Sequence, residues 1–65
     1  YSRVLDYLDI NALTIADLQF YIRDLDGHID DFKMMRKWNL VRECESEKKL
    51  MKVKQLELSD LILGL

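Results

Sequence analysis

Acidic residues surround a glycine near the middle of the chain, in the order Asp24, Asp26, Gly27, Asp30 and Asp31. In the loop that binds Ca²⁺ in EF-hand proteins, carboxylates stand at positions 1, 3 and 5, Gly at position 6 and Glu at position 12. With Gly27 at position 6, positions 1 and 12 fall on Ile22 and Lys33, so both anchoring ligands are missing. An exposed acidic helix face is therefore the favoured interpretation.

His28 follows Asp24 by four residues and precedes Asp31 by three, so a helix would place these side chains on one face. Two carboxylates and an imidazole could bind a metal, but no second His or Cys completes a tetrahedral zinc site. A metal-responsive or catalytic helical domain centred on Asp24, Asp26, His28 and Asp31 is one rival interpretation. The favoured interpretation is an exposed histidine beside carboxylates, and no cofactor or metal is expected.

Cys44 is the single cysteine, and its neighbours on a helix would include no histidine to activate it as a nucleophile. Acid–base catalysis by paired carboxylates needs an enclosed cleft, which a thin helical segment does not offer. The sequence therefore predicts no enzymatic activity and a structural thiol. A lone thiol suits a reducing compartment, so we expect an intracellular protein, cytoplasmic or nuclear.

Basic residues with one tryptophan follow the acidic part of the chain and could contact phosphates and stack on bases. The candidate contacts, which flank Trp38, are Lys33, Arg36, Lys37 and Arg42. A nucleic-acid-binding helical module using the basic stretch 33–54 is therefore the alternative function. The acidic half would compete for these cations, and the isoelectric point of about 5.2 is far below that of most nucleic-acid modules. Nucleic acid is thus not the favoured partner.

The elements that carry these residues are predicted to be helices, because the chain has no proline, only two glycines and no alternating strand pattern. Residues 1–13 are expected to form a short N-terminal helix, from Ser2 to about Ile10, and a connection. Residues 14–65 are expected to form a long helical or coiled-coil oligomerisation segment. Thr14 and Asp17 resemble a capping box and predict where this segment begins.

An apolar seam at heptad spacing is the strongest periodic signal in the chain. Its first part, with steps of three and four, is Ile15, Leu18, Ile22, Leu25, Ile29 and Phe32. Its later part is expected to include Trp38, Val41, Met51, Leu58 and Ile62. These eleven residues are the predicted helix–helix interface.

Two positions could interrupt the long helix. Gly27 could cap a helix end, but the seam continues on both sides of it and favours an unbroken helix. Asn39 is the better candidate for a break. The polar stretch 45–49 would be either the turn of a hairpin or an exposed part of one helix, and its lack of Gly, Pro or Asn disfavours the turn.

Acidic and basic residues are segregated along the chain. Residues 1–32 hold seven Asp and two Arg, for a net charge of −5, whereas residues 33–54 have a net charge of +5. Several acids lack a base three or four residues away, so an antiparallel neighbour would complement them. Exposed pairs contribute under about 1 kcal/mol each, so the charges would select orientation while the apolar face drives association.

The sequence thus predicts an all-α fold of long amphipathic helices, forming an antiparallel coiled coil or small helical bundle. A chain of 65 residues buries only a small core and usually needs a disulfide, a metal or a partner. We expect a protein–protein interaction segment of a larger protein, mediating oligomerisation or complex assembly. Its partner would be a second copy, as an antiparallel homodimer or higher oligomer, or a heterologous helix. No apolar run is long enough to predict a membrane span.

Overall fold

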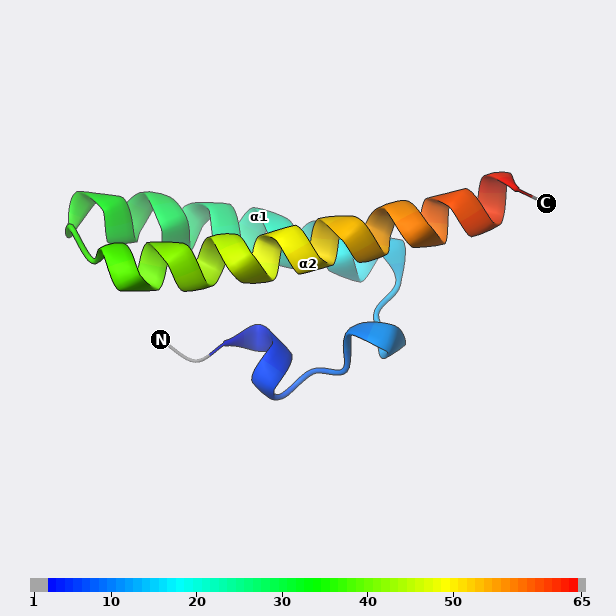
Figure 1. Cartoon of the computed structure of the whole chain (residues 1–65), viewed down its shortest axis with the longest axis horizontal. Helices are drawn as coiled ribbons and strands as arrows, with labels where there is room; N and C mark the ends of the chain where they lie inside the picture. Colours follow the sequence, from blue (N-terminus) through cyan, green and yellow to red (C-terminus); the bar gives the residue numbers. More distant parts are fainter. Residues whose placement is uncertain (1–2, 65) are drawn as a thin grey trace.

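Two antiparallel α-helices form a hairpin in the computed structural model, which describes residues 3–64 (Figure 1). Helix α1 spans Ile15–Met34 and helix α2 spans Trp38–Leu63, with residues 35–37 between them. The hairpin is elongated, and the C-terminal end of α2 runs on past the start of α1. The structure confirms the predicted all-α fold with long helices packed together, and it forms this packing within one chain.

The N-terminal segment, residues 3–13, lies along the hairpin and replaces the predicted short helix with two single turns of 3₁₀-helix (Figure 1). These turns, η1 and η2, span Val4–Asp6 and Ile10–Ala12. The Asp9 carboxylate accepts a hydrogen bond from Asn11 N at 3.0 Å and so begins a new turn. An α-helix of two turns has little stability of its own, so tertiary contacts decide the conformation of this segment.

Helix α1 begins at the predicted capping box. The Thr14 hydroxyl accepts a hydrogen bond from Asp17 N, and the Asp17 carboxylate accepts one from Thr14 N, both at 3.1 Å. The helix then continues through Gly27, as the unbroken seam predicts. Gly27 faces open space, because a Cβ added there would meet no heavy atom within 4 Å.

The turn between the helices lies at Arg36, so the predicted break at Asn39 is wrong. Lys37 N donates to Phe32 O at 2.9 Å, and Arg36 N donates to Lys33 O at 3.1 Å. This pair of bonds forms a Schellman motif, whose left-handed residue is usually glycine. Here that residue is Arg36, with φ of 56°, so the usual glycine signal is absent. Asn39 instead lies in the first turn of α2.

The apolar seam forms the core of the hairpin. From α1, the buried seam residues are Leu18, Ile22, Leu25 and Ile29, and from α2 the buried apolar residues are Val41, Cys44 and Met51. Val4 of η1 completes this core, and Phe32 and Leu58 pack partly buried against it. The seam therefore covers itself within a single chain.

Charge complementarity between α1 and α2 contributes less to the stability of the hairpin than burial of the apolar seam does. Within the described residues, one ion pair joins the helices, between Lys48 and Asp26, whose carboxylate is half exposed. A hydrogen bond from Gln55 Nε2 to Gln19 Oε1, 3.1 Å long, adds a second polar link. Exposed ion pairs contribute under about 1 kcal/mol, so burial of the seam must hold the hairpin together.

The exposed glycine inside α1 predicts a stabilising substitution. Gly27→Ala should raise the free energy of unfolding by about 0.5–1 kcal/mol, because alanine loses less backbone entropy in a helix and its methyl group meets no neighbour. Urea denaturation followed by circular dichroism measures the change. Gly64→Ala is the matched control and should give no gain, since its Cβ would lie 2.9 Å from Asp60 O. A destabilised Gly27→Ala variant would contradict a continuous α1.

Candidate interaction surface

Glu47 is a fully buried carboxylate in the middle of α2. Its Oε2 accepts a hydrogen bond from Val4 N at 2.9 Å, and its Oε1 lies 3.4 Å from Nε of Arg3. The polar stretch 45–49 therefore belongs to a continuous helix, as predicted, but its central residue is not exposed. Instead, Glu47 joins α2 to the N-terminal segment.

Burial of this carboxylate depends on its partners, because an unpaired charge in an apolar interior is strongly unfavourable. A hydrogen bond to a charged group contributes about 1.5–3 kcal/mol, and Val4 N would lose its acceptor without Glu47. The contact thus fixes η1 against the hairpin and places Val4 in the core. Glu47 could have been found from its spacing, since it lies three residues after Cys44 and four before Met51 on the buried stripe.

The predicted interface residues have different surroundings in the hairpin. Those fully covered within the chain are Leu18, Ile22, Leu25, Ile29, Val41 and Met51. Ile15, Phe32 and Leu58 are half-buried. Trp38 and Ile62 are exposed, at opposite ends of α2. Most of the seam is therefore covered within the chain, and Trp38 and Ile62 are its exposed members.

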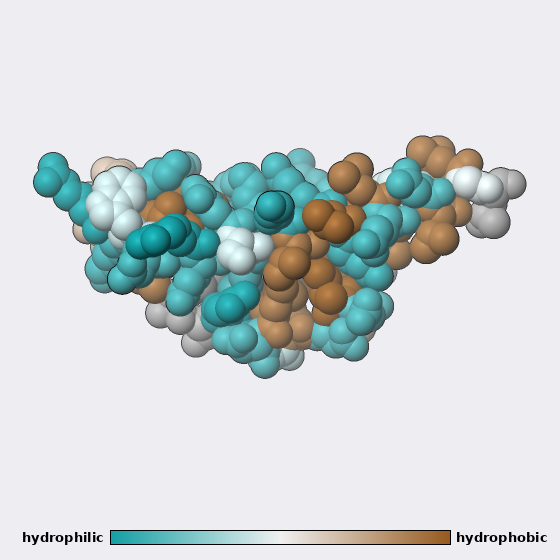
Figure 2. All heavy atoms as spheres, in the orientation of Figure 1, coloured by the Kyte–Doolittle hydropathy of each residue, from teal (hydrophilic) through white to brown (hydrophobic). Residues whose placement is uncertain are grey.

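The C-terminal half of α2 carries the largest group of exposed apolar side chains. We call this group the tail surface; it comprises Leu50, Val53, Leu56, Leu61, Ile62 and Leu63. Figure 2 shows hydrophobic residues gathered over this part of α2 and over the adjoining N-terminal segment. Leu5 and Ile10 of that segment line an open groove with Leu50 and Val53. The apolar area is therefore continuous across two elements.

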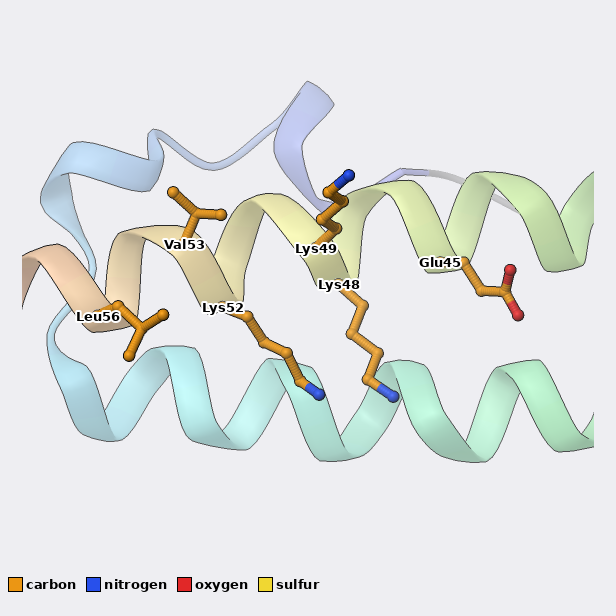
Figure 3. Close-up of a pocket in the computed structure, with 6 residues that line it drawn as sticks. All are labelled: Glu45, Lys48, Lys49, Lys52, Val53 and Leu56. Atoms are coloured by element: carbon orange, nitrogen blue, oxygen red, sulfur yellow. The ribbon is translucent and has the colours of Figure 1, made fainter.

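Two hollows adjoin the tail surface. The first, of about 360 Å³, has Val53 and Leu56 among its lining residues, together with Glu45, Lys48, Lys49 and Lys52 (Figure 3). In Figure 3, Lys48 and Lys52 extend toward α1 whereas Val53 and Lys49 lie on the other side of α2. The second, of about 580 Å³, lies where α2 passes the start of α1 and is lined in part by Leu13, Ile15, Leu58, Leu61 and Ile62. Charged side chains line the first hollow but not the second, so an apolar helix with a charged face would suit both.

The turn between the helices brings the predicted nucleic-acid contacts to one end of the molecule. Lys33, Arg36, Lys37 and Arg42 are all exposed there. Trp38 is 55% exposed beside them. These residues lie at the end of the hairpin opposite the C-terminus (Figure 1).

The acidic residues of α1 do not converge. Asp26 pairs with Lys48, and His28 Nε2 lies 3.3 Å from Asp24 Oδ2 while its ring stacks on Phe32. Across residues 3–64, no three or more His, Cys, Asp or Glu side chains gather as potential metal ligands. The Asp24–Asp31 stretch is regular helix, so it also lacks the loop backbone that calcium sites of this kind use.

Comparisons with protein families, curated proteins and solved structures gave no match to this chain. The described part of the chain also contains no helix with the length and apolar character needed to cross a bilayer. Function must therefore be inferred from the surface itself.

The Glu47 contact predicts that the N-terminal segment can be released separately from the hairpin. Glu47→Ala removes the acceptor of Val4 N, so this amide should exchange with deuterium faster and chymotrypsin should cleave sooner after Tyr7. Amides in the centre of α1 should keep most of their protection. Glu43→Ala, an exposed glutamate one turn earlier in α2, is the matched control and should leave both readouts unchanged. Equal loss of protection throughout the chain would show that Glu47 supports the whole hairpin instead.

Proposed function

We propose that this chain is a protein–protein interaction segment that takes part in oligomerisation or complex assembly through the C-terminal half of α2. The observation that carries the proposal is the tail surface: six large apolar side chains exposed within fourteen residues, from Leu50 to Leu63. Single exposed apolar residues are ordinary on protein surfaces, but several gathered along one half of a helix are characteristic of an interaction site.

The size of the exposed surface also supports this function. The chain exposes 4826 Å². A compact monomer of its mass, 7.8 kDa, would expose about 4,400 Å². The excess reflects an elongated hairpin whose second helix is longer than its first. A partner that covered the tail surface would remove part of this excess from water and stabilise the fold.

A helix is the partner that this surface fits. The tail surface lies on a single helix, α2, whose buried face already packs against a second helix, α1. A partner helix lying antiparallel to α2 would cover exposed apolar side chains of the tail surface, as α1 covers the buried seam. An intracellular location, cytoplasmic or nuclear, is part of the proposal and is supported by the single buried thiol of Cys44.

Cross-linking of the intact protein in its own cells tests this function. An amine-reactive reagent should join Lys49, Lys52 or Lys54, which lie around the tail surface, to another polypeptide chain. Leu56→Asp with Leu61→Asp should reduce these cross-links by at least about tenfold, because two charges would enter an apolar interface.

Met34→Asp is the matched control, since Met34 is exposed at the turn, far from the tail surface. It should leave the cross-links unchanged, and circular dichroism should show all variants equally helical. Cross-links that persist in the Leu56→Asp, Leu61→Asp variant would refute the proposed function.

Nucleic-acid binding is the second candidate, favoured by one observation. The turn places Lys33, Arg36, Lys37 and Arg42 beside the exposed indole of Trp38 at a single end of the molecule. Such a cluster can neutralise phosphates while the ring stacks on a base.

A gel shift with single-stranded oligonucleotides tests this candidate. Binding should weaken steeply between 50 and 200 mM salt and disappear when Lys33, Arg36 and Lys37 are replaced by Glu. Lys49→Glu with Lys52→Glu, which changes lysines outside the turn, should retain most of the binding. The absence of a shift for the unmodified protein at low salt would eliminate this candidate.

A further inference from the structure

We infer that the partner of the tail surface is a second copy of this chain, with α2 packed antiparallel against α2 of the other copy. This inference rests on the proposed function and specifies its partner. It is carried by a second heptad stripe on α2, which is separate from the buried seam.

The second stripe has steps of four, three, four and three along the exposed side of α2. Its members, in order, are Lys49, Val53, Leu56, Asp60 and Leu63, and all five are exposed. At 3.6 residues per turn, this stripe lies on the side of α2 opposite Met51 and the other buried residues. The hairpin therefore leaves this stripe exposed, with Val53 also lining the groove beside the N-terminal segment.

An antiparallel copy gives this stripe a self-complementary register. When Val53 lies opposite Leu56 of the second copy, twofold symmetry places Leu56 opposite Val53 of that copy. The same register places Lys49 opposite Asp60 of the second copy, and Asp60 opposite its Lys49. Two apolar layers are then flanked at both ends by pairs of opposite charge.

The charges of the C-terminal half of α2 favour this orientation over the parallel one. Bases occupy positions 48, 49, 52 and 54, and acids follow at 57 and 60, so antiparallel copies bring unlike charges together. A parallel pair would place Lys49 on Lys49 and Asp60 on Asp60. Among the described residues, neither side chain has an ion pair within its own chain, whereas Lys54 and Glu57 lie 3.8 Å apart. Lys49 and Asp60 are thus available to a second copy.

The inferred interface is small, so the dimer should be weak and dependent on concentration. Burial of Val53 and Leu56 from both copies supplies the attraction, and the charged pairs select the antiparallel register. Because each copy contributes one Lys49 and one Asp60, reversing the charge at either position replaces attraction with repulsion at both ends of the dimer. Such a change is expected to weaken association by about tenfold.

Sedimentation equilibrium of the intact protein tests the inference with two charge-reversed variants. Lys49→Glu and Asp60→Lys should each associate at least about tenfold more weakly than the unmodified protein. An equimolar mixture should regain its dimer, because an antiparallel mixed pair again has unlike charges at both ends. In a parallel dimer like charges already face each other, so neither variant alone would weaken association. Lys33→Glu, at the end of the hairpin far from the stripe, should associate normally, and equal melting temperatures should show that all variants fold.

The possible outcomes separate the inference from the proposed function. A dimer that is weakened by each variant and restored by mixing supports both. A dimer that neither variant weakens, or that mixing does not restore, overturns the antiparallel α2 contact. A monomer at every concentration overturns the second copy as partner. In that case, cross-links from Lys49, Lys52 or Lys54 to a different protein would still support the proposed function. Absence of both association and cross-links overturns both.

Discussion

Burial of one heptad seam between α1 and α2 is the constraint on which the structure depends. Leu18, Leu25 and Met51 are completely buried there, and each fully buried apolar side chain contributes about 1.5–3 kcal/mol. The Lys48–Asp26 pair lies at the rim of this contact, where an ion pair contributes under about 1 kcal/mol. Neither helix has much stability alone, so the seam determines both helix formation and the antiparallel arrangement.

The N-terminal segment is held against the hairpin by one polar residue within that seam. Glu47 occupies a buried position where an apolar residue would be expected, and its carboxylate holds Val4 N and lies beside Arg3. A hairpin of two helices leaves one side of its seam thinly covered, and Val4, with the adjacent N-terminal residues, covers it. The chain thus completes a small core with one directed contact, although a disulfide within it is impossible because it has a single cysteine.

Local signals made most of the fold predictable. The capping box at Thr14 and the repeat through Gly27 each depend on residues close in sequence, and the structure confirms both. The turn was misplaced because its left-handed residue is Arg36 rather than glycine. The contact between Glu47 and Val4 was missed because the two residues lie 43 positions apart. Spacing along a helix predicts which face is buried, but it does not identify a distant segment that satisfies a polar residue on that face.

The unequal lengths of the two helices explain why apolar residues near the end of α2 are exposed. At a rise of about 1.5 Å per residue, the 20 residues of α1 extend for about 30 Å and the 26 residues of α2 for about 39 Å. About 9 Å of α2 therefore has no α1 beside it, and Ile62 of the seam falls in that part. Leu56 and Leu63 are on the outer side of the same helix, so a hairpin with α1 cannot cover them. Apolar residues that the intramolecular contact cannot reach are the strongest support for an intermolecular one.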